Sequence, residues 1–461
     1  MDKKTKIIII GCGAGGGTAA QLARKTDRNS EITIFEKGKY AQYSKCGLPY
    51  VLSGEISSFN NLIEFSENWF EKENIKLYLN TSVTEINKTK HIVLAKRDNE
   101  QIKKEFDKLI IATGAKAFIP SIKNIFENNK LVSGVHLLRT MDDAKALFSE
   151  LKHTKKASII GAGLIGLEIA DTLYKKGIDI TIIESLSNIL ENTLDIDMSE
   201  PIKKELEVKT NLFTNHIASK IETENSRIKQ IIIKNKETNQ EKKIETDLLV
   251  IATGSKPEVN LAEKIGCKIG KRGGIIISEK TLTSLSNIYA VGDCTEYKDF
   301  VTNEPTCVGL GSIAVRHGIA AGVNAAGGEY NLPSGLLQTR TSEFFGFEVA
   351  AVGLVKNVIK NIQTVYGKFS GSSLPHYYPG GKNITIKVGV NEKNGEIVSA
   401  QAVGSNAAQR INVFACAIQN NVRVENLKKL ETAYAPPIAP TLDVLTLSCD
   451  VAFLKYSRKK R

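Results

Sequence analysis

Two glycine-rich motifs carry the strongest chemical signal in the sequence. Gly11, Gly13 and Gly16 form a GxGxxG pattern between a run of isoleucines and a stretch of small residues. Such glycines permit a tight turn and let backbone N–H groups approach a pyrophosphate at the start of a helix. Glu36 follows Gly16 by about 20 residues, where an acid hydrogen-bonds a ribose hydroxyl. This spacing predicts a dinucleotide-binding unit.

The second motif repeats this layout. Gly161, Gly163 and Gly166 again lie between a strand-like run and a helical pattern, and Glu184 ends the next strand-like run. A carboxylate suits a free 2′-hydroxyl and repels a 2′-phosphate, and no lysine or arginine follows Glu184 until Lys203. The motif therefore favours NADH over NADPH, and NADPH stays open because a remote loop can supply a phosphate clamp.

A single cysteine stands in the segment YSKCGLPY, residues 43–50. No second cysteine lies nearby, so Cys46 cannot form an internal disulfide with a close neighbour. The thiolate is the reactive species in disulfide exchange. We expect the adjacent Lys45, and a helix that starts just after Cys46, to lower the pKa of this thiol.

Composition limits the class of protein. Lys and Arg number 62 against 50 Asp and Glu, and the net charge of +12 favours nucleic acid, an anionic membrane or a phosphorylated small molecule. The sequence holds no aromatic-basic nucleic-acid module and no apolar stretch of about 18 residues. Its 7 cysteines are scattered, which argues against a disulfide scaffold or a metal site. We therefore expect a cytoplasmic protein with phosphorylated small-molecule partners, no nucleic acid, no membrane and no metal.

The elements that position these motifs form two related halves and a third unit. Residues 107–116 and 247–256 share an apolar run followed by Ala-Thr-Gly, and each closes the half that its glycine motif opened. From about Gly335 the pattern changes to strand-like runs at 347–357, 384–391 and 397–404, then a helix at 407–419. The sequence thus predicts an α/β fold of two Rossmann-like domains followed by an α+β domain, with a charged, solvated tail at 455–461.

A late segment completes a family pattern. Residues 288–293 read IYAVGD, and with the two glycine motifs and the two ATG segments the chain resembles the pyridine nucleotide-disulfide oxidoreductases over nearly its whole length. The resemblance implies FAD at the first motif and NAD(P)H at the second. It implies an FAD-binding domain at 1–115 and 256–333, an NAD(P)H-binding domain at 116–255, and a C-terminal dimerisation domain at 334–461.

The resemblance also assigns binding residues. In the family, the aspartate of the late segment, here Asp293, contacts the ribityl chain of the flavin. The expected FAD contacts are Gly11, Gly13, Gly16, Glu36, Lys37, Ala112, Thr113 and Asp293. The expected NAD(P)H contacts are Gly161, Gly163, Gly166, Glu184 and Gly254.

The segment around Cys46 resembles the single-cysteine, coenzyme A-disulfide reductase branch. That branch also carries YYPG and AYAPP motifs, which stand here at 377–380 and 433–437. The resemblance implies that Cys46 forms a mixed disulfide with coenzyme A, and that Tyr377 and Tyr434 reach the partner subunit's active site in a homodimer. Expected substrate contacts are Ser44, Lys45 and Lys25.

Two alternatives remain at this point. The first is an NADH oxidase that reduces oxygen through the flavin and a cysteine sulfenate. The oxidase and peroxidase branch usually has a histidine in the first glycine loop, where this chain has Ala14. The second is a redox-sensing flavoprotein that acts by binding a partner, without turnover of a small disulfide.

Overall fold

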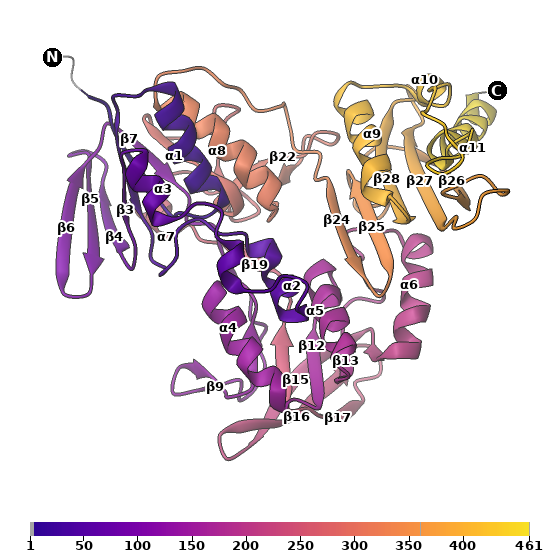
Figure 1. Ribbon diagram of the computed structural model, residues 1–461, viewed down its shortest axis with the longest axis horizontal. Helices are drawn as coiled ribbons and strands as arrows, with labels where there is room; N and C mark the ends of the chain where they lie inside the picture. The colour runs from indigo at the N-terminus through magenta and orange to yellow at the C-terminus, as the bar shows by residue number, and fades with distance from the viewer. Residues whose placement is uncertain (1–3, 360, 461) are drawn as a thin grey trace.

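The first glycine motif belongs to a parallel sheet with the strand order β21-β7-β1-β2-β3 (Figure 1). The structure is a computed structural model that describes residues 4–359 and 361–460. The strands are β1 Lys6–Ile10, β2 Glu31–Phe35, β3 Ile75–Tyr78, β7 Lys108–Ile111 and β21 Ile288–Ala290. The isoleucines of β1 are buried, as expected for a strand covered on both faces. The chain leaves this sheet after β7 and returns much later to add β21.

The second glycine motif belongs to a matching parallel sheet, with the order β11-β18-β12-β13-β14. Its strands are β11 Val135–Leu137, β12 Lys156–Ile160, β13 Asp179–Ile183, β14 Asn211–Phe213 and β18 Leu248–Ile251. Helices α4 Met141–Glu150, α5 Leu164–Lys175 and α6 Ile196–Lys209 accompany it. A two-stranded link, β8 Ala115–Ala117 with β19 Ser255–Pro257, joins this half to the first.

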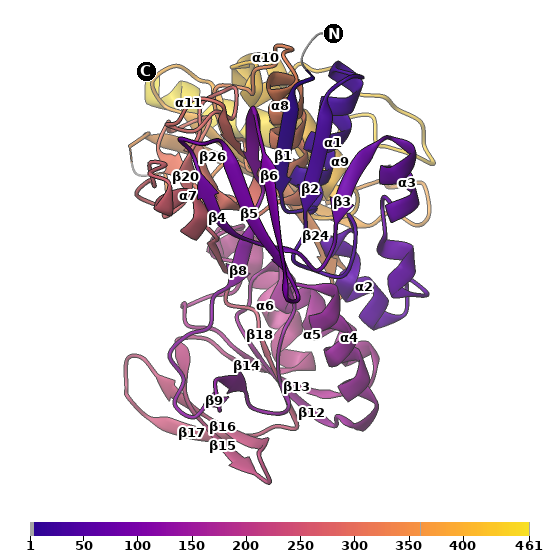
Figure 2. The same ribbon diagram turned by 90° about the vertical axis from the view of Figure 1, so that its left-hand side faces the viewer.

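Helix α1 (Ala14–Thr26) packs closely on α8 (Gly311–Ala325), and both views show the two helices side by side (Figures 1 and 2). A Cβ atom added at Gly318 would lie 2.4 Å from the Gly15 carbonyl oxygen, and one at Gly322 would lie 2.3 Å from that of Ala19. Only glycine permits so short a distance between the helix backbones. The contact brings the start of α8 next to the first glycine loop.

Smaller antiparallel sheets extend both halves. In the first half they are β4 Ser82–Asn87, β5 Ile92–Arg97 and β6 Glu100–Glu105, with β20 Ile275–Ile276, β22 Thr295–Lys298 and β23 Pro305–Thr306 nearby. In the second half they are β15 His216–Glu224, β16 Arg227–Asn235 and β17 Glu241–Glu245, and the pair β9 Phe126–Glu127 and β10 Lys130–Leu131. Short helices α2 Leu48–Ser53, α3 Glu67–Lys72 and α7 Asn260–Lys264 complete this part.

The third unit is an antiparallel sheet with the order β24-β25-β28-β27-β26, on the right in Figure 1. Its strands are β24 Arg340–Phe344, β25 Phe347–Val352, β26 Thr364–Ser372, β27 Asn383–Asn391 and β28 Ile397–Gly404. Helices α9 Ala407–Gln419, α10 Val424–Leu427 and α11 Val444–Lys460 pack with it. The predicted fold class, two Rossmann-like halves followed by an α+β unit, is confirmed.

An ion-pair cluster, formed by Asp195, Asp197, Lys368 and Lys387, fastens the third unit to the second half. The Lys387 ammonium lies 2.7 Å from Asp195 Oδ2 and 2.6 Å from Asp197 Oδ1, and only 10% of its side chain is exposed. Lys368 reaches Asp197 Oδ2 at 3.2 Å from a more exposed position. The two aspartates stand at the start of α6 and the two lysines on β26 and β27, so the cluster joins the two units.

The described residues contain neither a membrane-spanning helix nor a cluster of metal-binding side chains. Within residues 4–359 and 361–460, no helix combines the length and apolarity that crossing a bilayer requires. The same residues hold no group of three or more His, Cys, Asp or Glu side chains arranged for a metal ion.

Candidate functional site

A single large cavity of about 1800 Å³ connects the two glycine loops and the third unit. Sites for one small ligand usually measure about 300–1,000 Å³, so this cavity has room for more than one. Gly11 and Gly13 line it from the first half, Gly161 and Gly163 from the second, and Arg340 from the third.

The three glycines of the first loop have distinct roles. Gly11 has φ +105°, and a Cβ atom there would lie 2.3 Å from the Ala112 carbonyl oxygen. A Cβ atom at Gly16 would lie 2.0 Å from the Gly11 carbonyl oxygen, so Gly16 lets the helix pack on the strand. Gly13 has no atom within 4 Å of its Cβ position and faces the open cavity. This cradle fits the pyrophosphate of a dinucleotide such as FAD.

The second loop reproduces this geometry. A Cβ atom at Gly161, which has φ +108°, would lie 2.5 Å from the Ala252 carbonyl oxygen, and one at Gly166 would lie 2.0 Å from that of Gly161. Gly163 again faces open space. Gly254 lies on the same wall, with φ +93°. The second cradle therefore fits a dinucleotide as well as the first.

The two acids are held in the same way. Glu36 accepts hydrogen bonds from the backbone N–H groups of Cys12 and Gly38, both at 2.7 Å. Glu184 accepts them from Ala162 at 2.7 Å and Leu186 at 2.8 Å. Each carboxylate thus braces its own glycine loop and also lines the cavity, where a ribose hydroxyl can reach it.

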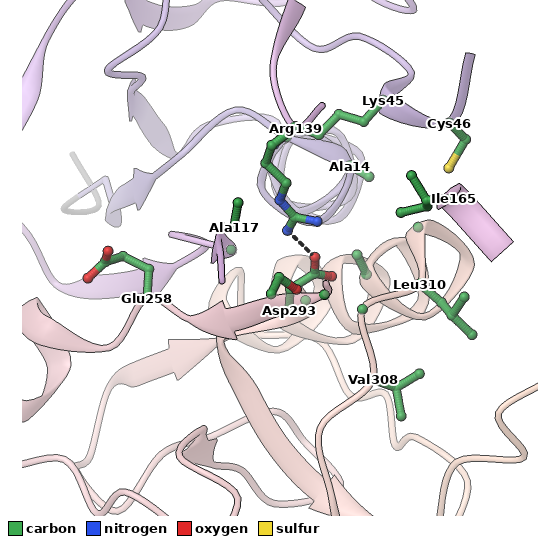
Figure 3. Close-up of a pocket in the computed structure, with 18 of the residues that line it drawn as sticks. Ala14, Lys45, Cys46, Ala117, Arg139, Ile165, Glu258, Asp293, Val308 and Leu310 are labelled. Carbon is green, nitrogen blue, oxygen red and sulfur yellow. Dashed lines mark hydrogen bonds and ion pairs between the residues drawn. The ribbon is translucent and has the colours of Figure 1, made fainter. Parts of the chain in front are cut away.

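The centre of the cavity holds an ion pair that sequence analysis missed. Figure 3 shows Arg139 paired with Asp293. Arg139 Nη2 lies 2.5 Å from Asp293 Oδ2, and Arg139 Nε donates to the Ala115 carbonyl oxygen. Asp293 is a predicted flavin contact, and Lys37, Ala112 and Thr113 line the same cavity. The two members of the ion pair are 154 residues apart in the chain. No local spacing connects them, so only the fold reveals the pair.

Cys46 lies in the cavity wall, within the 3-10 turn Lys45–Gly47 that precedes α2. A Cβ atom at Gly311, the first residue of α8, would lie 3.8 Å from the Cys46 sulfur. The thiol is accessible from the cavity, whose walls still withdraw it from bulk water. Burial, with the charges of Glu168 and Asp293, raises the pKa of the Cys46 thiol, and Arg139 and Lys45 only partly offset this.

The expected lowering of the pKa of Cys46 is therefore wrong in its net direction. Lys45 acts as expected, but burial is the larger effect. Burial and the nearby Arg139 also lower the pKa of Lys45 itself. Ser44 and Lys45 line the cavity beside Cys46, whereas Lys25 is exposed near the far end of α1 and is not among the lining residues.

The two predicted tyrosines meet outside the cavity. The hydroxyl oxygens of Tyr377 and Tyr434 lie 2.6 Å apart, and 60% and 47% of the two residues are exposed. The hydrogen bond to Tyr434 raises the pKa of Tyr377. Ile438 and Leu442, near Tyr434 in the chain, are 72% and 64% exposed. An exposed tyrosine pair beside apolar side chains is typical of a surface that contacts another subunit.

Glu168 is a second residue that sequence analysis missed. It stands on α5, lines the cavity and accepts a hydrogen bond from the Ser342 hydroxyl on β24. Burial raises the pKa of Glu168. The contact brings a carboxyl group near Cys46 and joins the second half to the third unit.

The fold and the site define a class of protein: an enzyme with two dinucleotide sites that open on one cavity, with the exposed thiol of Cys46 in its wall. The pyridine nucleotide-disulphide oxidoreductase model matches residues 5–318, and the dimerisation domain model of the same family matches residues 340–445. The chain belongs to the pyridine nucleotide-disulphide oxidoreductase family. It is an FAD-dependent NAD(P)H oxidoreductase, as predicted from its motifs.

Individual relatives carry several activities. The chain is 36% identical to an NADH oxidase of Methanocaldococcus jannaschii, over 98% of this chain and 100% of the relative. It is 29% identical to a coenzyme A disulfide reductase of Staphylococcus haemolyticus, over 96% and 98% of the two chains. The solved structure of an NAD-dependent persulfide reductase from A. fulgidus superposes with a TM-score of 0.93 at 32% identity, over 98% of this chain and 84% of that one. The predicted resemblance to coenzyme A-disulfide reductases is thereby confirmed.

Proposed function

We propose that the chain uses NAD(P)H to reduce coenzyme A disulfide, or a related low-molecular-weight disulfide or persulfide, through Cys46. The observation that carries this proposal is the exposed thiol of Cys46 in the wall of a cavity that both dinucleotide loops share. Cys307 also lines this cavity, but it is half-buried, and burial raises its pKa to about 12. Relatives named for coenzyme A disulfide and persulfide reduction support it. The proposed domains are 1–115 with 256–333 for FAD, 116–255 for NAD(P)H and 334–461 for dimerisation.

Cys46 would act in two steps: it first exchanges with the substrate disulfide, and the resulting mixed disulfide is then reduced. Gly11, Gly13 and Asp293 would hold FAD, which would supply two-electron chemistry between NAD(P)H and Cys46. The Cys46 thiolate attacks the substrate disulfide, which forms a mixed disulfide and releases one thiolate. Two electrons then cleave the Cys46 mixed disulfide, so that the second thiolate leaves and the Cys46 thiolate is regenerated. Each cycle consumes one NAD(P)H, one proton and one disulfide, and yields two thiols.

Residues of the cavity support these steps. Asp293 and Arg139 would hold the flavin between the first glycine loop and Cys46, and Ser44 and Lys45 would contact the substrate beside the thiol. In a homodimer, the hydrogen-bonded Tyr377 and Tyr434 of one subunit would reach the partner's cavity, where a tyrosine hydroxyl donates a proton to the leaving thiolate.

The test of this function uses Cys46→Ser in the FAD-loaded protein under anaerobic conditions. We expect oxidation of NADH by coenzyme A disulfide in the wild type and none in the variant, with FAD still bound. Cys416→Ser serves as the matched control, because Cys416 is an exposed thiol that does not line the cavity. Turnover that survives in Cys46→Ser would exclude the mixed-disulfide mechanism.

Preference for NADH is a separate part of the proposal. Glu184 presents its carboxylate to the cavity at the end of β13, where a 2′-phosphate would meet its charge. Glu184→Arg is expected to shift the ratio of kcat/KM for NADPH to that for NADH by at least about tenfold. A wild type that already prefers NADPH would refute this role of Glu184.

The second candidate function is oxidation of NADH by oxygen, because a relative over the full chain is named NADH oxidase. The absence of a histidine at Ala14 counts against it. Consumption of NADH that requires oxygen, and that added coenzyme A disulfide leaves unchanged, would favour this candidate over the first.

A further inference from the structure

Arg340 places a half-buried positive charge in the wall of the main cavity. It is the first residue of β24 in the third unit, and that unit carries neither glycine loop. Its Nη2 donates to the Gly353 carbonyl oxygen at 3.1 Å. Its Nε is buried and has no hydrogen-bond partner among the described residues. Burial lowers the pKa of Arg340 to about 10, so the guanidinium stays charged at neutral pH.

Among residues 4–359 and 361–460, no acidic side chain forms an ion pair with this guanidinium. In the part of the chain that the structure describes, no carboxylate oxygen lies within 4.0 Å of Arg340. Asp299 is close enough to act on the charge of Arg340, but its own oxygens are taken by neutral donors. Asp299 Oδ2 accepts from the Gln338 amide at 2.8 Å, and Oδ1 accepts from the backbones of Val301 and Thr302.

The backbone conformation of Gln338 helps to keep Asp299 from pairing with Arg340. Gln338 has φ +56°, a left-handed conformation that is unusual for a residue with a long side chain. Its side chain is buried, lines the cavity and holds Asp299. Strained residues of this kind often cluster at functional sites. Here the strained residue keeps the nearest carboxylate bonded to itself instead of to Arg340.

Arg340 lines the cavity at the start of the strand that also contacts Glu168. Alternate residues of a strand share one face, so Arg340 and Ser342 point to the same side of β24. The Ser342 hydroxyl bonds to Glu168, whose charge acts on Cys46. Two strand residues span about 7 Å, which sets the distance between the backbone positions of Arg340 and Ser342.

The surroundings favour a charged ligand over water. Leu310, Leu354 and Val355 line the cavity together with Arg340. A guanidinium beside apolar walls binds an anion more strongly than one in bulk water, because the local dielectric constant is low. The pyrophosphates of the two dinucleotides already have the glycine loops, so Arg340 is available to a third anion.

We propose that Arg340 is an anion-binding residue of the cavity and holds a negatively charged group of the sulfur-containing acceptor. This inference rests on the proposed function, because it names a binding contact for the acceptor that Cys46 attacks. The anion has two chemical sources. One is a phosphate of the nucleotide part of coenzyme A disulfide, and the other is a terminal charge of a polysulfide or persulfide chain.

Three acceptors distinguish these sources in steady-state assays of the FAD-loaded protein. Coenzyme A disulfide carries phosphates, pantethine has the same disulfide arms without the nucleotide phosphates, and inorganic tetrasulfide carries its charge on sulfur. Arg340→Gln should raise KM at least about tenfold for the acceptor that Arg340 binds. KM for pantethine should change less than twofold.

Two further variants serve as controls. Arg340→Lys keeps the charge and should restore most of the affinity for the charged acceptor. Arg97→Gln removes the same charge from an exposed residue on β5, outside the cavity, and should leave all three KM values unchanged. In a Cys46→Ser background, which binds acceptor without exchange, calorimetry with coenzyme A disulfide measures the loss of binding without turnover.

The outcomes separate this inference from the proposed function. A higher KM for coenzyme A disulfide alone would assign the phosphate, and a higher KM for tetrasulfide alone would assign the sulfur chain. Equal KM values in Arg340→Gln and Arg97→Gln, with an active wild type, would overturn the role of Arg340 only. A shifted flavin reduction potential with unchanged KM values would also overturn it, by placing Arg340 against the flavin. A wild type that reduces none of the acceptors would overturn the proposed function itself.

Discussion

Replacing Lys387 by methionine should loosen the third unit from the second half of the molecule. The substitution removes the ammonium group that lies 2.7 Å from Asp195 and 2.6 Å from Asp197. The Asp195 side chain is only 8% exposed. Its Oδ2 forms an ion pair with Lys387 but accepts no hydrogen bond from the described residues. Its Oδ1 keeps one donor, the backbone N–H of Lys356 at 2.8 Å. In the variant, the buried Asp195 carboxylate therefore keeps the Lys356 N–H as a partner of Oδ1 but loses the ammonium group beside Oδ2.

The expected cost follows from the exposure of these groups. Removing one partner of a buried pair costs about 3–5 kcal/mol. The lower value, about 3 kcal/mol, applies here because Asp197 is 47% exposed and is rehydrated easily. Lys368→Met removes a pair whose two side chains are 37% and 47% exposed, so its cost should be below about 1 kcal/mol.

Thermal unfolding of the FAD-loaded protein measures this difference. At about 2 °C per kcal/mol, Lys387→Met should lower the apparent Tm by about 6 °C, and Lys368→Met by no more than about 2 °C. Because the cluster fastens β27 to the start of α6, the NADH affinity of Lys387→Met should fall as well. Equal Tm shifts in the two variants would refute the reasoning, since they would show that burial does not set the strength of the pair.

Three further predictions concern the site and the same cluster. Glu168→Gln removes a charge that raises the pKa of Cys46, so alkylation of Cys46 by iodoacetamide should be faster at neutral pH in the variant than in the wild type. Gly166→Ala places a Cβ atom 2.0 Å from a carbonyl oxygen and should lower Tm, whereas Gly163→Ala meets no atom within 4 Å and should mainly weaken NADH binding in a fluorescence titration. Burial alone would raise the pKa of Asp197, but its lysine partners lower it overall. Its contribution to stability should therefore be complete above about pH 4 and disappear as pH falls through the lowered pKa, which urea unfolding across that range would measure.

Local patterns allowed much of the fold and part of the site to be predicted from the sequence. The glycine loops and their acids are short-range features, because each carboxylate binds backbone N–H groups of its own loop. Helix α9 begins and ends where its apolar period indicates. Helix α11 was missed, because its apolar residues follow no clear helical period. Only a charged tail was expected there, and the described part of that tail is helical.

The parts of the site that could not be predicted from the sequence depend on long-range contacts. Arg139 and Asp293 are far apart in the chain, and nothing near Arg340 in the sequence indicates that it lacks an acidic partner. The direction of the pKa shift of Cys46 also could not be predicted from the sequence, for the same reason. Lys45 is visible beside Cys46 in the sequence, whereas the burial and the remote Glu168 that outweigh it depend on the folded cavity.

The return of β21 to the first sheet has a consequence for synthesis of the protein on the ribosome. Strand β7 ends at Ile111, but its outer edge is covered only by β21, which begins at Ile288, roughly 180 residues later. At about 5–20 residues per second, translation leaves that edge open for about 10 to 35 s. An open apolar strand edge invites wrong pairing with other chains. The nascent chain must therefore protect β7 while the whole second half is made, and slower translation across residues 112–287 lengthens that exposure.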